Sequence, residues 1–154
     1  MIAVIQRVKR AAVTIEEKLA GECGKGLMIL LGVAEGDTDY DAELLATKIS
    51  KLRIFSDEGG KMNLSVKDVD GEMLVVSNFT LLANYVKGNR PDYLSSAKPD
   101  EANRLYEYFK SLVKQEVRRV ESGEFGADME VTIVNDGPVT IVMDSKLLNK
   151  NRGQ

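Results

Sequence analysis

The sequence predicts an α+β fold, in which two main helices accompany a mixed, largely antiparallel β-sheet. Segments with strand character outnumber those with helical character, and the helices do not alternate regularly with the strands. The 154 residues contain no internal repeat, low-complexity tract or interdomain linker, so we expect residues 1–154 to form a single domain.

The first part of the chain predicts two strands and a helix. Residues 2–15 alternate with a period of two, which places Ile2, Val4, Gln6 and Val8 on one face and Ala3, Ile5, Arg7 and Lys9 on the other. Residues 25–33, "KGLMILLGV", are a nearly continuous apolar run and predict a strand buried on both faces. The period then changes, because Leu45, Ile49 and Leu52 recur at helical spacing and predict a helix from Thr38.

The middle of the chain predicts a buried strand, a loop and a second helix. Residues 72–83, "EMLVVSNFTLLA", favour a strand whose apolar run is interrupted by polar residues near its end. Residues 88–99 have loop composition. We expect the second helix to begin at Asp100-Glu101, to hold Arg118-Arg119 in its last turn and to end at Ser122-Gly123.

The last predicted element is a β-hairpin with an unusual turn. Two β-branched runs, at about residues 128–134 and 139–144, flank Asp136-Gly137, which is a strong hairpin signal. Pro138 follows this glycine directly, where the returning strand would use its first backbone N–H, and proline has none. A proline at this position indicates that the turn does more than reverse the chain.

Composition excludes several classes of function. Hydrophobic residues make up 44% and charged residues 29% of the chain, as in soluble globular proteins. The net charge of −3 means that a nucleic acid would need a local basic patch, and we expect no DNA partner. No apolar run approaches the roughly 18 residues of a membrane span, and the N-terminus lacks the pattern of a signal peptide. With Cys23 alone there is no internal disulfide, and we expect a cytoplasmic protein without a membrane partner.

The sequence contains no histidine. This removes the commonest general base and the commonest zinc ligand. The one cysteine, Cys23, lies in a Gly-rich segment, "AGECGKG", where we expect an inert thiol. The sequence therefore predicts neither a metal nor a cofactor.

The segment "SNFTL", residues 77–81, is the first candidate site. On its own it is typical of a strand end whose polar side chains satisfy nearby backbone groups. The alternative is that Ser77, Asn78 and Thr80 face a pocket while Phe79 points into the core by alternation. A hydroxyl is a poor nucleophile without a base, so Thr80 would orient a substrate rather than attack it.

The segment "NDGPVT", residues 135–140, would by itself be a structural turn. The segments "GKGLMILLGV", "GKMNLSV", "SNFTL", "KGNRPD" and "NDGPVT" follow one another in this order along the chain, and together they resemble the D-aminoacyl-tRNA deacylase family. The family's two signature motifs are Ser-Gln-Phe-Thr and Asn-x-Gly-Pro-(Val/Phe)-Thr. The second matches at every position, whereas Asn78 replaces the usual glutamine of the first, which puts any contact made by that side chain in doubt.

The resemblance implies a barrel-like sheet and a metal-independent hydrolase that removes D-amino acids, and also glycine mischarged on tRNA-Ala, from tRNA. It implies a homodimer with active sites at the interface and aminoacyl-tRNA as the partner. The Gly137-Pro138 peptide would be cis and would project into the partner's pocket, where it would exclude L-amino acids. Arg7 matches the arginine that fixes this dipeptide.

The resemblance also implies roles for individual residues. Backbone groups would hold the developing oxyanion, while the ribose 2′-hydroxyl would assist the attacking water. The expected catalytic segment is Ser77, Asn78, Phe79 and Thr80, and the expected substrate-binding residues are Gly137, Pro138, Arg7 and Ser96. Lys87 and Arg90 are candidate contacts to tRNA phosphates, although exposed loop charges are more often only solvated.

Three alternatives stay open at this point. A related deacylase class with a trans Gly-Pro accepts small L-amino acids, but its motif replaces the residue at Phe79. A similar fold serves as an editing domain in some archaeal threonyl-tRNA synthetases, and we expect no synthetase attached to this chain. The third is a tRNA- or protein-binding module without turnover, which only Asn78 favours.

Overall fold

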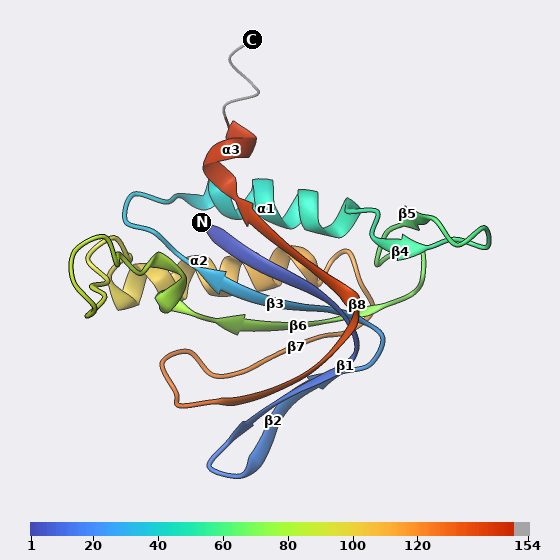
Figure 1. The fold of residues 1–154 in the computed structure, drawn as a ribbon, viewed down its shortest axis with the longest axis horizontal. Coiled ribbons are helices and arrows are strands. Elements are labelled where there is room, and N and C mark those ends of the chain that lie inside the picture. Colours follow the sequence, from blue (N-terminus) through green and yellow to red (C-terminus); the bar gives the residue numbers. More distant parts are fainter. Residues whose placement is uncertain (150–154) are drawn as a thin grey trace.

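The computed structural model describes residues 1–149, which form a mixed sheet and three α-helices (Figure 1). The six-stranded sheet has the order β2-β1-β3-β6-β7, and β8 also pairs with β1. Its strands are β1 (Ile2–Ile15), β2 (Lys18–Cys23), β3 (Gly26–Gly32), β6 (Glu72–Ser77), β7 (Val120–Ser122) and β8 (Glu130–Asp144). The remaining elements are α1 (Asp39–Lys51), a small β4–β5 pair (Phe55–Ser56, Met62–Leu64), the 3₁₀ helix η1 (Phe79–Leu82), α2 (Pro99–Val113) and α3 (Ser145–Asn149).

The sheet curls until its two outer strands nearly meet. The Glu22 N–H of β2 donates to the carboxylate of Glu121 in β7 at 2.9 Å. A Cβ added to Gly21 would lie 2.5 Å from the carbonyl oxygen of Ser122, so only glycine allows this approach. The prediction of an α+β fold with a mixed, barrel-like sheet is therefore confirmed.

The predicted C-terminal hairpin is wrong. Residues 130–144 form one continuous strand, β8, which runs antiparallel to β1 along nearly its whole length. The pairing skips positions opposite Arg7, where Asp136, Gly137, Pro138 and Val139 have no partner in β1. A bend that contains extra residues and a proline interrupts the ladder locally without reversing the chain. The turn signal at Asp136-Gly137 therefore marks a bulge.

The strand pair β1 and β3 supplies both sides of the core. Alternate β3 residues, Leu27, Ile29 and Leu31, pack under the helices, whereas Met28 belongs to a second cluster with Val8 of β1. This confirms the prediction that β3 is buried on both faces. Each such side chain contributes about 1.5–3 kcal/mol of burial free energy, so β3 anchors the sheet next to the strand that leads to the site.

The two long helices cover one face of the sheet (Figure 1). Thr38 is the N-cap of α1, as predicted, and its N–H donates to Asp41 Oδ2 at 2.8 Å. The predicted end of α2 is wrong, because this helix stops at Val113 and residues 120–122 form strand β7. Arg118 and Arg119 follow the helix instead of ending it, and both pair with Glu72. Among residues 1–149, no helix is long and apolar enough to cross a membrane.

Candidate active site

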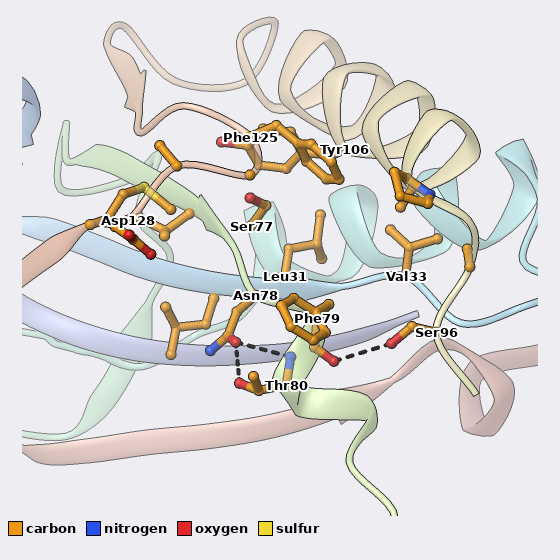
Figure 2. A pocket seen from close by; sticks show the side chains of 18 of the residues that line it. Leu31, Val33, Ser77, Asn78, Phe79, Thr80, Ser96, Tyr106, Phe125 and Asp128 are labelled. Carbon is orange, nitrogen blue, oxygen red and sulfur yellow. Dashed lines mark hydrogen bonds between the residues drawn. The ribbon is translucent and has the colours of Figure 1, made fainter. Parts of the chain in front are cut away.

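A cavity of about 700 Å³ opens at the carboxyl end of β6 (Figure 2). The ends of β3 and β6, η1, the start of α2 and the segment before β8 surround it. Its lining is mainly apolar and includes Leu31, Val33, Val76, Ala102, Tyr106, Phe125, Met129 and Val131. The polar side chains in the lining are Ser77, Asn78, Thr80, Ser96, Tyr106 and Asp128. Among the described lining residues only Asp128 carries a charge, so the site is an apolar pocket with a polar edge.

The polar edge forms where β6 stops being a strand. The Asn78 N–H donates to Leu31 O at 2.8 Å, after which the chain turns into η1. Asn78 is the N-cap of η1, and its Oδ1 accepts from the Thr80 N–H at 3.2 Å and from the Thr80 hydroxyl. Asparagine favours such a turn because its short side chain reaches the backbone two residues on. The predicted pocket-facing set of Ser77, Asn78 and Thr80 is thus brought together.

The prediction that Phe79 points into the core is wrong. Its side chain is 59% exposed, because the strand has ended and alternation no longer applies. The ring packs edge-on against Tyr93, with 5.0 Å between ring centroids. Phe79 therefore stands at the rim of the pocket and forms part of one wall, while Tyr93 packs against its ring.

Ser96 lies at the same rim although it is 17 residues further along the chain. Its hydroxyl donates to the carbonyl oxygen of Phe79 at 3.3 Å (Figure 2). An isolated bridge pairs Ser96 with Ala34 just beyond β3, which places it beside the pocket. Ser96 therefore supports η1 and the pocket together.

The backbone of η1 offers one uncommitted donor. Phe79 N–H donates to no other residue in the described part of the chain, whereas Thr80 N–H already donates to Asn78. A backbone N–H at the mouth of an apolar pocket can stabilise a developing oxyanion without any ionisable side chain. The Phe79 amide is therefore the one that η1 leaves available for this task.

Sequence reasoning missed the opposite wall of the pocket. Tyr106 of α2 and Phe125 of the 123–129 segment stand side by side there, with ring centroids 6.1 Å apart (Figure 2). The Tyr106 hydroxyl donates to Val75 O at 3.0 Å, and burial raises its pKa to about 12. The aromatic residue between glycines in "GEFGAD" was the available signal, but residues 123–129 have no periodicity to indicate where they pack.

Gly137 and Pro138 do not line this pocket. Their peptide bond is cis, and both residues are exposed on the bend of β8. Arg7 holds the bend: its Nε donates to Asp136 O at 3.1 Å and its Nη1 to Ile54 O at 2.7 Å. Within one chain, the two signature motifs therefore occupy separate places.

Lys87 and Arg90 lie in the loop between η1 and α2. A two-residue bridge between Asn84 and Asp92 closes this loop, with backbone hydrogen bonds of 2.8 and 3.0 Å. Both cations are exposed, and neither forms an ion pair with a residue in the described range 1–149. They are available to an anionic partner.

No group of three or more Cys, Asp or Glu side chains is arranged to hold a metal ion in residues 1–149. The single thiol, Cys23, is buried at the end of β2, and burial raises its pKa to about 11. The groups that the pocket itself offers are hydroxyls, amides and one carboxylate. This donor set is suited to positioning a substrate and a water molecule.

Comparisons with known proteins agree with one another. The model of the family described as D-Tyr-tRNA(Tyr) deacylase matches residues 4–144. A D-aminoacyl-tRNA deacylase from Caldicellulosiruptor saccharolyticus is 56% identical over 146 residues, which cover 95% of this chain and 98% of the relative. Another from Thermotoga petrophila is 52% identical over 148 residues, covering 96% and 99%.

Two solved structures have the same fold. The c-Myc DNA unwinding element binding protein superposes with a TM-score of 0.89 at 41% identity, covering 94% of this chain and 98% of its own. A probable eukaryotic D-amino acid tRNA deacylase superposes with a TM-score of 0.78 at 17% identity, covering 93% and 98%. The second likeness concerns the fold alone.

Proposed function

Because the chain belongs to the D-Tyr-tRNA(Tyr) deacylase family and is by that membership a D-aminoacyl-tRNA deacylase, we propose that it hydrolyses D-aminoacyl-tRNA at the pocket beside η1 and rejects L-aminoacyl-tRNA. The observation that carries this proposal is the convergence of residues 77–80 and Ser96 on one apolar cavity. We propose a cytoplasmic location, because aminoacyl-tRNA is a substrate of that compartment.

The proposed chemistry is hydrolysis of the ester between the amino acid and the terminal ribose. The oxygen of a water molecule bonds to the carbonyl carbon, the ester C–O bond breaks, and the leaving ribose oxygen takes up a proton. The Phe79 N–H is the donor that we assign to the developing oxyanion. The neighbouring ribose 2′-hydroxyl assists the water, since the pocket lining offers no histidine.

We assign the large apolar part of the pocket to the terminal adenosine and the amino-acid side chain. Tyr106 and Phe125 provide aromatic surface on which a base can stack. Lys87 and Arg90, on the loop beside η1, would contact phosphates of the acceptor stem. Replacing either cation should weaken the binding of all aminoacyl-tRNAs alike and should leave the choice between D and L unchanged.

Rejection of L-amino acids would come from a second copy of the chain. Gly137 and Pro138 are exposed and lie outside the pocket of their own chain, yet they are the second signature motif. A two-fold dimer would bring each dipeptide to the partner's pocket, where it would occupy the space of an L side chain. Glycine has no side chain to exclude, so glycyl-tRNA is proposed as a second substrate.

The decisive experiment compares D-tyrosyl-tRNA, L-tyrosyl-tRNA and glycyl-tRNA carried on tRNA-Ala. We expect rapid release of D-tyrosine and glycine, no measurable release of L-tyrosine, and a dimer in sedimentation equilibrium. The rates should survive exhaustive chelation, and activity that is lost and then restored by zinc would refute the metal-independent mechanism. A monomer with full chiral selectivity would refute the cross-subunit gate.

A binding module without turnover is the competing function, and Asn78 is the feature that favours it. Under this alternative, the wild type would bind aminoacyl-tRNA but hydrolyse neither enantiomer, and Asn78→Gln would restore hydrolysis. Under the proposed function, Asn78→Gln changes an already substantial rate by less than about tenfold, which is ~1.4 kcal/mol of activation free energy.

A further inference from the structure

Two donors of Thr80 meet one oxygen of Asn78 (Figure 2). The Thr80 N–H donates to Asn78 Oδ1 at 3.2 Å, and the Thr80 hydroxyl contacts the same atom. Because a backbone N–H can only donate, the atom that it meets must be the carboxamide oxygen and not the nitrogen. The Thr80 hydroxyl must therefore donate to this oxygen as well.

This arrangement fixes what the Thr80 hydroxyl can do in the pocket. A hydroxyl has one proton and two acceptor lone pairs. Its proton is directed at Asn78, so only the lone pairs remain for a molecule in the pocket. An amide oxygen is not a base at neutral pH, so Asn78 does not prepare Thr80 for nucleophilic attack. Thr80 is left as a hydrogen-bond acceptor.

Resting on the proposed function, we infer that Asn78 is a positioning residue that holds the Thr80 hydroxyl as an acceptor for an O–H of the attacking water. By occupying the Thr80 N–H, Asn78 also leaves the oxyanion to the N–H of Phe79. The water would thus be held on the Thr80 side of the ester carbon, while the carbonyl oxygen points to Phe79. Asn78 acts through Thr80 and need not touch the substrate.

The chain contains turns of the same kind that lack this consequence. Asn84 Oδ1 accepts from Val86 N–H and Asp92 Oδ1 accepts from Leu94 N–H, each at 3.2 Å. Both turns lie on the surface loop, and neither has a hydroxyl two residues further on. Of these three side chains, Asn78 is the one that accepts a hydrogen bond from a hydroxyl in the pocket lining.

The test is a double-mutant cycle on single-turnover hydrolysis of D-tyrosyl-tRNA. Asn78→Leu keeps the side-chain size and removes the acceptor, and Thr80→Val removes only the hydroxyl. We expect each single variant to lower the hydrolysis rate by about 10- to 100-fold while substrate affinity stays within about threefold. The double variant should be no slower than the slower single variant, because both substitutions remove the same hydrogen bond between the Thr80 hydroxyl and Asn78.

Two further variants separate this role from a structural one. Asn78→Asp keeps an oxygen at the same reach and should be at least about fivefold faster than Asn78→Leu. Asp57→Leu removes a turn bond of the same kind, from Gly59 N–H to Asp57 Oδ1 at 2.9 Å near the β4–β5 pair, and should leave the rate unchanged. Thermal unfolding of each variant checks the fold, and if Asn78→Leu does not fold, the comparison of Asn78→Asp with Thr80→Val carries the test.

The outcomes distinguish the inference from the function beneath it. A wild type that hydrolyses no D-aminoacyl-tRNA overturns the proposed function and the inference with it. An active wild type for which Asn78→Leu has no effect, or for which the two losses multiply, overturns the inference alone. Equal rates for Asn78→Asp and Asn78→Leu would also overturn it, because the acceptor oxygen would then be irrelevant.

Discussion

The guanidinium of Arg7 in β1 donates to the backbone carbonyl of Asp136 in β8, with 3.1 Å between Nε and the oxygen. The same side chain reaches Ile54 O at 2.7 Å, and its Nε lies 3.4 Å from the Asp136 carboxylate. A planar guanidinium can serve several acceptors at once, whereas an ammonium cannot match this fork. Arg7 therefore ties the bend that carries Gly137 and Pro138 to the segment after α1.

Arg7→Met should loosen this bend. The substitution leaves the carbonyl groups of Asp136 and Ile54 without their donor. This lowers the unfolding free energy by about 1–3 kcal/mol if water does not reach them. We expect hydrolysis of L-tyrosyl-tRNA to rise relative to D-tyrosyl-tRNA by at least about tenfold. The control is Arg10→Met, an exposed arginine on the same strand. Unchanged selectivity in a folded Arg7→Met protein would show that Arg7 does not support the gate.

Gly137→Ala should impair the reaction in the partner's pocket more than it impairs the fold. Gly137 has a φ of +139°, and an added Cβ would lie 2.8 Å from the backbone nitrogen of Val139 and 3.3 Å from Arg7 Nη2. The backbone must shift, at a cost on the order of 1–3 kcal/mol. We expect D-tyrosyl-tRNA hydrolysis to fall at least about tenfold, measured beside Gly60→Ala.

Gly60 is the matched control because it also has a positive φ, +79°, but has open space around its Cβ position. Gly60→Ala should lower the unfolding free energy only through the unfavourable backbone conformation, by about 1–2 kcal/mol. If the two variants lose stability alike and both keep full activity, the space next to Gly137 does not matter for the substrate.

Thr80→Ala should retain a measurable fraction of activity, on the order of 1–10% of the wild-type rate. The side chain positions the reaction, but it has no base to make it a nucleophile. Rapid quenching of the wild type during turnover, followed by mass spectrometry, should show no aminoacyl group on Thr80. An aminoacyl adduct on this residue would contradict the assignment.

The Cys23 thiol should resist alkylation in the folded protein. Burial raises its pKa to about 11, well above its ordinary value, so the protonated form dominates at pH 8. Only about one thiol in a thousand is then the reactive thiolate. We expect iodoacetamide to label Cys23 slowly at pH 8 and quickly in denaturant, and Cys23→Ala to keep full activity. Fast labelling of the native protein would show that the β2 end opens.

The sequence predicted the individual segments well where one physical signal governed them. The run at residues 26–32 is apolar throughout because both faces of β3 are buried, and Thr38 caps α1 just before the residues that recur at helical spacing. Ser77, Asn78 and Thr80 were identified as one polar group because they interrupt an apolar strand. Their convergence with Ser96 came from the resemblance, which the comparisons support.

By itself, the sequence determined the fold class and the polar interruption at residues 77–80, because these depend on residue types and short spacings, and the order of its motifs indicated the family by resemblance. Only the tertiary structure decided that Asp136-Gly137 is a bulge, since β8 pairs with β1 on both sides of it, between residues that are distant in the sequence. It also decided that Phe79 is exposed, because β6 ends at Ser77 and alternation no longer applies two residues later. Phe125 joined the pocket for a similar reason: a segment without periodicity takes its position from the surfaces that it packs against.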